Sequence, residues 1–265
     1  MSFTLFKLNV KNNSILLLIF VFVLCLYLGE IMYMFDPTST KAMMDMMNMM
    51  PSDLIAAFGY DQIGSTLTTF IAGFYYGFLV FAFPMVYYVI LANRLVCKLV
   101  DSGAFCYLLQ TPTSRKKIIV TQGVYLLFSI AVLFGIVYAV GLWAAGAMFP
   151  GLLDVAAFTR LHVSTTLMTM ALAMVCFFYS CFFNETKLSL AFGTGIPLAF
   201  LLFNMIGGVS ENAEVFKDMS LFSLLDATAI VENGDTTGIN LLFLAMIVIL
   251  FVSSVFVFDK KRLPL

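Results

Sequence analysis

Six long stretches without a charged residue constrain the fold of this chain more than any other feature. Each one reaches or approaches the roughly 20 residues that a helix needs to cross the hydrocarbon core of a bilayer. Continuous apolar runs predict helices rather than the alternating strands of a membrane barrel, because a helix pairs its own backbone groups. The sequence therefore predicts an all-α polytopic membrane protein with six transmembrane helices. We place the spans at residues 14–34, 64–93, 118–146, 161–183, 188–208 and 238–258.

The overall composition excludes a soluble protein of this size. Hydrophobic residues make up 62% of the 265 residues and charged residues only 11%, whereas about 25% of a typical soluble domain is charged. The first apolar run is followed by Glu30 and Ile31 rather than by a small-residue cleavage site. We therefore interpret it as a retained span and not as a signal peptide. We expect a single transmembrane domain over residues 1–265, without a nucleotide-binding domain.

The distribution of positive charge predicts how the chain is oriented. Lys and Arg number 14, and all but Lys41, Arg160 and Lys217 fall on the side that holds both termini. Cytoplasmic loops of membrane proteins carry an excess of Lys and Arg. Most of the 15 acidic residues fall on the opposite side. We therefore predict that both termini are cytoplasmic.

The stretch between the second and third spans, residues 99–117, has the features of a contact surface. Its middle predicts a short amphipathic helix with these apolar residues on one side: Phe105, Leu108 and Leu109. Pro112 lacks a backbone donor and disfavours helix at Thr111, so the helix should end there. Ser114 can cap the next helix, which begins with the basic residues 115–117. A helix at the membrane surface between two spans is available to a cytoplasmic partner.

The N-terminal residues predict an interfacial helix over residues 1–13 that leads into the first span. Phe6 and Val10 lie on one side of this helix and Lys7 and Lys11 on the other. Such a pattern is typical of a helix that lies in the plane of the membrane surface. A frayed cytoplasmic tail is the alternative.

The second span carries two local signals. The spacing of Gly73 and Gly77 permits close approach of another helix. Pro84 lies further along the same span and should kink it.

On the outer side, residues 43–50 contain six methionines. Thioethers can bind Cu(I), but no Cys or His accompanies them, so we prefer a flexible apolar surface. A second short helix is expected from Ser52 or Asp53 to Gly59. We also expect a surface segment at 151–162 and a re-entrant or surface-lying helix within residues 221–230.

Few residues could carry chemistry within the spans. We interpret the single histidine, His162, as an interfacial polar residue rather than a proton relay, because no acid lies beside it on the same helix face. Glu30 is the one candidate intramembrane acid, and a carboxylate that reaches the outer interface is the alternative. The five cysteines lie in apolar runs or on the cytoplasmic side, which favours packing roles over a disulfide framework. The sequence shows no GxxxxGK(S/T) loop, zinc motif or paired nucleophile, so we do not expect this chain to be an enzyme by itself.

Asp101, Gly103, the Leu108-Leu109 pair, Thr111-Pro112 and Ser114-Arg115 follow one another at a characteristic spacing. This stretch resembles the segment between the second and third spans of ABC-2 type transporter permeases. That family more often has Glu where this chain has Asp101. Other parts agree in type and position: the basic LFKLNVKNN helix, Met50-Pro51 to Gly59, the hairpin FFNETKLSLAFGTG and the basic ending DKKRL.

The resemblance implies ABC-2 type (type V) exporter architecture in a bacterial cell membrane, with a coupling helix at about 102–113. It also implies a second permease subunit, identical or homologous, and two separate ATP-binding subunits. ATP and Mg would bind to those subunits, and we expect no cofactor, metal or nucleic acid on this chain. The residues expected to couple to the ATPase are Asp101, Gly103, Phe105, Leu108, Leu109, Thr111, Pro112, Ser114, Arg115 and Lys116. The candidates for the pathway or the dimer interface are Tyr27, Glu30, Gly73, Gly77 and Asn204.

The expected function is that of the permease subunit of an ATP-driven exporter. Its cargo would be amphipathic or hydrophobic, such as a peptide, an antibiotic or a lipid-like molecule. A receptor or scaffold subunit that senses an extracellular ligand is one alternative, and it would regulate ATPase activity without moving cargo. A membrane-embedded enzyme is another, and it requires catalytic polar groups in the spans and activity in the isolated chain.

Overall fold

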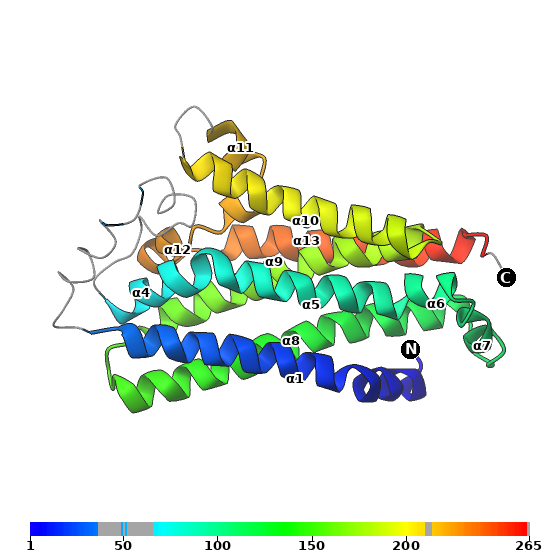
Figure 1. Cartoon of the computed structure of the whole chain (residues 1–265), viewed down its shortest axis with the longest axis horizontal. Helices are drawn as coiled ribbons and strands as arrows, with labels where there is room; N and C mark the ends of the chain where they lie inside the picture. Colours follow the sequence, from blue (N-terminus) through cyan, green and yellow to red (C-terminus); the bar gives the residue numbers. More distant parts are fainter. Residues whose placement is uncertain (37–48, 50, 52–65, 210–213, 264–265) are drawn as a thin grey trace.

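The computed structural model describes residues 1–36, 49, 51, 66–209 and 214–263, and all regular structure in these residues is helical. It contains six helices long and apolar enough to cross a membrane, which confirms the expected number. They form an elongated bundle with both termini at the same end (Figure 1). The long helices are α1 (Phe3–Met34), the combined α4 (Leu67–Phe74), η2 (Tyr75–Leu79), α5 (Val80–Leu95) and α6 (Cys97–Asp101), then α8 (Arg115–Met148), α9 (Val155–Phe182), α10 (Thr186–Val209) and α13 (Thr237–Lys260).

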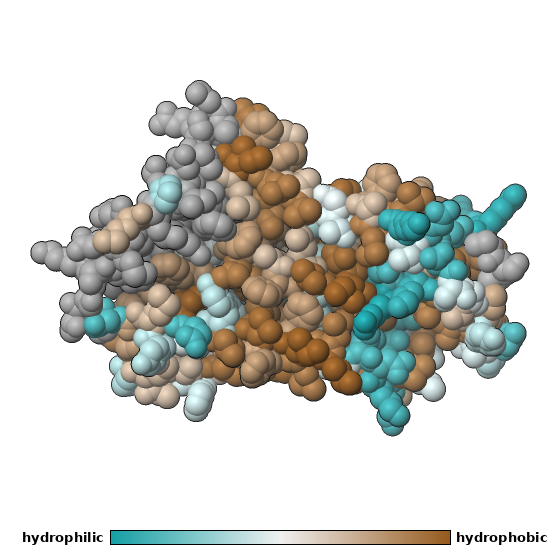
Figure 2. Space-filling view, in the orientation of Figure 1, coloured by the Kyte–Doolittle hydropathy of each residue, from teal (hydrophilic) through white to brown (hydrophobic). Residues whose placement is uncertain are grey.

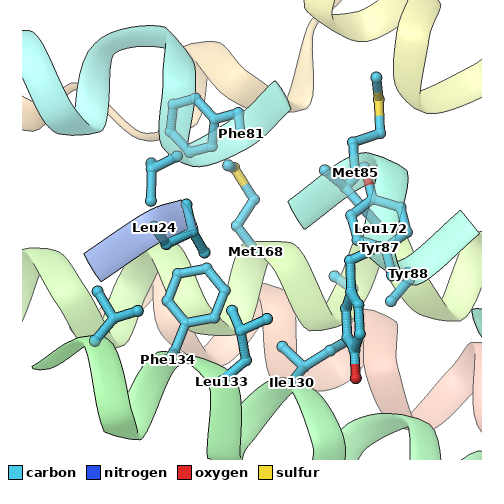
Figure 3. Close-up of a cluster of buried hydrophobic side chains, with 14 of the residues drawn as sticks. Leu24, Phe81, Met85, Tyr87, Tyr88, Ile130, Leu133, Phe134, Met168 and Leu172 are labelled. Atoms are coloured by element: carbon cyan, nitrogen blue, oxygen red, sulfur yellow. The ribbon is translucent and has the colours of Figure 1, made fainter. Parts of the chain in front are cut away.

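Helix α9 lies at the centre of the bundle. It is the most buried of the six spans, and it packs against α5, α8, α10 and α13. The core around it is apolar and aromatic, and Figure 3 shows part of it, including Phe134 of α8 and Met168 and Leu172 of α9. Peripheral helices such as α1 and α13 instead expose apolar side chains, among them Phe22 and Val252. Figure 2 shows the resulting brown belt across the middle of the molecule, which suits a lipid environment.

Side-chain caps explain where two of the spans begin. The Ser114 hydroxyl accepts a hydrogen bond from the backbone N–H of Lys117 at 3.4 Å, as expected for a cap of α8. The Asp154 carboxylate accepts bonds from the backbone N–H groups of residues 156 and 157 at 2.9 and 3.0 Å and so starts α9 at Val155. The expected separate surface segment at 151–162 was therefore wrong in its second half. Ala157, Phe158 and Leu161 belong to α9 and are buried within the bundle.

The N-terminal segment also differs from expectation. Helix α1 runs without a break from Phe3 to Met34, so residues 1–13 form no separate interfacial helix. The reason lies in polar contacts with α8. The Asn9 side-chain amide donates a hydrogen bond to the side-chain oxygen of Gln122 at 2.5 Å, and the Ser2 backbone N–H donates to the Thr121 hydroxyl at 2.8 Å. These bonds hold the first turns of α1 along the bundle.

The second span contains a π-helical segment, η2, between α4 and α5. Such segments are single wide turns that often mark functional sites. The segment lies before Pro84, which has no N–H to donate to the carbonyl four residues earlier. Gly73 is buried just before η2, and Gly77 is half-buried within it. The span including α6 has 35 residues and is roughly 50 Å long, so it exceeds the ~30 Å hydrocarbon core.

The acidic segment before α13 folds as three short helical pieces rather than one. They are α11 (Glu214–Asp218), the 3-10 helix η4 (Leu221–Leu224) and α12 (Ala227–Asn233). The apolar part packs on the bundle, as its composition indicated: Phe222 is buried with its ring 5.0 Å from that of Phe81. The Ser220 hydroxyl donates to the Phe200 carbonyl at 2.7 Å. The methionine-rich segment 43–50, apart from Met49, and the helix expected from residue 52 or 53 to 59 lie outside the described residues.

Candidate functional site

Positive charge gathers at the end of the bundle that holds both termini and α6, which we call the basic end. The teal side chains in Figure 2 mark it. Near the opposite end, Arg160 is the only Lys or Arg whose side chain the structure describes. The basic end carries Lys7, Lys11, Arg94, Lys98, Arg115, Lys116, Lys117, Lys187, Lys260, Lys261 and Arg262.

The stretch expected to contact a partner is a tight turn and a short helix at this end. After α6 ends at Asp101, Gly103 adopts φ +74°, a left-handed conformation that favours glycine. Helix α7 (Phe105–Leu109) follows. It is shorter than the expected helix at 102–113, because the glycine turn precedes it and Pro112 follows it. The Thr111 hydroxyl closes the last turn by donating to the Leu108 carbonyl at 2.6 Å.

The apolar side of α7 faces the bundle. Phe105 is 0% exposed, and its ring lies 5.1 Å from that of Phe258 near the end of α13. Leu108 and Leu109 are half-buried and pack against the same core. Phe105 therefore fixes α7 to the bundle, and Leu108 and Leu109 contribute to the same contact.

The exposed side of α7 carries an aromatic residue that the sequence reasoning missed. Tyr107 is 74% exposed. Its neighbours Gln110, Thr111 and Pro112 are also exposed. The signal was present in the helical phase, because a residue two positions after the buried Phe105 points about 200° away from it.

Helix α6 is tied to the corner between α9 and α10. The Cys97 backbone N–H donates to the Ser180 hydroxyl at 3.0 Å, and that hydroxyl donates to the Ala92 carbonyl at 2.9 Å. The Asp101 carboxylate accepts a hydrogen bond from the Thr186 backbone N–H at 3.2 Å. Thr186 is the first residue of α10, so Asp101, at the end of α6, caps that helix. This role was not foreseen from the sequence.

The C-terminal segment closes the arrangement from the other side. Lys116 forms an ion pair with Asp259 at 3.3 Å, and the Arg115 guanidinium donates to the Lys261 carbonyl at 3.3 Å. The Lys261 ammonium donates to the carbonyls of Cys181 and Phe183 at 2.9 and 2.6 Å, where it caps the end of α9. Burial lowers the pKa of Lys261 below its ordinary value.

These contacts join one exposed element to most of the spans. A displacement of α6 and α7 would reach α9 and α10 through Cys97 and Asp101, and α13 through Phe105. The start of α8 is joined to the end of α13 by the Lys116 ion pair. The arrangement suits transmission of movement. Among the described residues, no group of three or more His, Cys, Asp or Glu could hold a metal ion.

The candidate pathway residues fall in different places. Tyr27 is half-buried on α1 and stacks on Tyr75 of η2 with ring centres 6.0 Å apart. Gly73 and Gly77 lie in the same part of the second span. Glu30 is exposed on α1, and the half-buried Asn204 lies on α10. Helix α10 packs on α5 and α9, so Asn204 lies on a different helix contact from Tyr27 and Glu30 of α1.

The single histidine lies inside the bundle, which corrects its assignment as an interfacial residue. His162 is 5% exposed. Its Nε2 lies 2.9 Å from the Phe134 carbonyl of α8, and its Nδ1 lies 2.6 Å from the Tyr76 hydroxyl of η2. A carbonyl only accepts, so Nε2 carries the proton and Nδ1 accepts from Tyr76. The side chain therefore joins α8, α9 and η2.

Comparison with known proteins leaves the family of this chain open. No protein-family profile matches it, and no curated protein matches it significantly.

Proposed function

We propose that this chain is the permease subunit of an ATP-driven exporter of the ABC-2 type, with its basic end in the cytoplasm. The observation that carries the proposal is the exposed element α6–α7, which is fixed by specific contacts to the ends of α9, α10 and α13. A transporter that receives energy from a separate ATPase needs such an element. The excess of Lys and Arg at this end supports the orientation.

In the proposed mechanism, two ATP-binding subunits close around ATP and push on α7. Because Phe105 fixes α7 and Asp101 caps α10, the movement passes to the spans as one displacement. The α9–α10 corner follows, held by Cys97 on one side and by Lys261 on the other. A second permease subunit would complete the pathway. The apolar, aromatic-rich spans favour an amphipathic or hydrophobic cargo.

Co-purification tests this proposal. The tagged chain is solubilised from membranes of its own host in mild detergent, and its partners are identified by mass spectrometry. We expect a protein with a phosphate-binding loop in equal molar amount, and ATP-dependent movement of a fluorescent lipid or peptide probe in vesicles that contain both. Replacement of the phosphate-loop lysine of the partner is the control. Purification of the chain without any ATPase would contradict the proposal, and ATPase binding without cargo movement would favour the receptor alternative.

A further inference from the structure

We infer that Tyr107 anchors this chain in an acidic pocket of the ATP-binding subunit, with Lys98 and Lys117 at the rim of that pocket. The inference rests on the proposed function and names the surface chemistry of the partner. It concerns a residue and two charges that the sequence pattern did not single out for this contact.

Tyr107 is presented to the outside by a helix that is itself fixed to the bundle. Its side chain is 74% exposed, whereas Phe105 on the same five-residue helix is fully buried. The helix is therefore held in place while the tyrosine ring points away from the bundle. Tyrosines supply large apolar contact area with a polar tip, and they are enriched at the energetic centres of protein interfaces. A fixed anchor also loses little conformational entropy when it binds.

The location of Tyr107 distinguishes it from the other strongly exposed aromatic residues. Tyr33 and Trp143 are 78% and 74% exposed. Both lie near the opposite ends of their long spans, where aromatic side chains commonly meet the membrane interface. Helix α7 lies instead at the far tip of the basic end, beyond the brown belt (Figures 1 and 2).

Positive charges lie on both sides of α7 in the sequence. Lys98 precedes the helix, Lys117 follows it, and both are exposed. The one acidic residue between them in the sequence is Asp101, which accepts a hydrogen bond from the Thr186 backbone N–H and keeps its negative charge. Asp259 is paired with Lys116 at 3.3 Å. Residues 98–117 therefore carry four Lys and Arg side chains against one acidic side chain, and the complementary surface is acidic.

An anionic membrane surface is the other occupant that such charge could attract, but the neighbours of these lysines argue against it. Lys7 and Lys11 on α1 alternate with exposed apolar residues such as Phe3, which suits a membrane surface. The exposed residues between Lys98 and Lys117 are largely polar, including Ser102, Gln110 and Thr111. This contrast provides matched controls.

The test measures binding of the co-purifying ATP-binding subunit to the full chain in nanodiscs of neutral phosphatidylcholine. Tyr107→Ala should weaken binding about tenfold or more, whereas Tyr33→Ala should leave it within about twofold of wild type. Lys98→Glu with Lys117→Glu should weaken binding at low salt, and the loss should shrink at high salt. Lys7→Glu with Lys11→Glu is the control for charge at the same end. All six positions are exposed, and circular dichroism checks that each variant is folded.

The results distinguish a failure of the Tyr107 inference from a failure of the proposed permease function. If the ATPase binds the Tyr107 and Lys98/Lys117 variants as tightly as wild type, the inference fails and the proposed function stands. An equal loss in the Lys7/Lys11 variant shows that only general charge acts, which overturns the assigned rim. If, in parallel nanodiscs that contain phosphatidylglycerol, the Lys98/Lys117 variant retains less of this lipid but binds the ATPase like wild type, the occupant is the membrane surface. If no ATPase associates with the wild-type chain, both the inference and the proposed function fail.

Discussion

Replacement of Phe105 by alanine should release α7 from the bundle without unfolding the spans. The Phe105 side chain is fully buried against Phe258, at an end of the bundle that we place outside the hydrocarbon core. Removing a buried aromatic side chain costs about 3–5 kcal/mol when it leaves a cavity, and burial of a phenylalanine side chain from water contributes about 1.5–3 kcal/mol. We therefore expect α7 to lose about 2–3 kcal/mol of the free energy that holds it against α13.

Hydrogen exchange of the backbone amides in residues 105–110 measures this loss directly. Since about 1.4 kcal/mol corresponds to a factor of ten, the protection of these amides should fall roughly 30-fold to 150-fold. Amides in the middle of α9 should keep their protection. Tyr107→Ala is the matched control on the same helix, because its side chain is exposed and should change little. Unchanged exchange in Phe105→Ala would refute the view that this ring fixes α7.

Three further predictions concern other contacts. Asp101→Ala should increase amide exchange at Thr186, which loses its acceptor, whereas Asp101→Asn keeps an acceptor oxygen and should change it less. Gly123→Ala should destabilise the chain in detergent by about 1–3 kcal/mol, because a Cβ there would lie 2.7 Å from a ring atom of α13, whereas Gly135→Ala on the same helix meets no atom within 4 Å and should be neutral or slightly stabilising. Tyr76→Phe should cost about 1 kcal/mol in the same thermal unfolding assay, because it leaves a buried histidine nitrogen without its donor.

Each of these three predictions has a specific result that would contradict it. Equal exchange at Thr186 in both Asp101 variants and wild type would show that the cap does not hold α10. Equal stability of the two glycine variants would contradict the close packing of α8 on α13. A Tyr76→Phe variant as stable as wild type would show that the hydroxyl contributes no net stability.

The number of spans could be predicted from the sequence because it depends on local hydropathy. The Ser114 cap and the apolar side of α7 were predictable because both depend on residues that are close together in the sequence. The inward orientation of that side was not, because it depends on Phe258, which is distant in the sequence. Membership of the ABC-2 type family, the coupling role and the partners stay predictions.

The polar contacts of the candidate site could not be predicted because they join residues far apart in the chain. The Asp101 cap on Thr186 and the two Lys261 bonds link separate loops at one end of the bundle. Burial of His162 likewise depends on Tyr76, a residue of another span. The extension of α1 through residues 3–13 results from Asn9 meeting α8, whereas the local pattern favoured a membrane surface.

The most direct test of the central claim is photocrosslinking from position 107 in native membranes. The photoreactive residue p-benzoylphenylalanine replaces Tyr107 in the full chain, and the same replacement of Tyr33 is the control. We predict a crosslink from position 107 to a protein that carries a GxxxxGK(S/T) loop, with no such product from position 33. Crosslinks from position 107 only to lipid, or only to proteins without an ATP-binding loop, would contradict it.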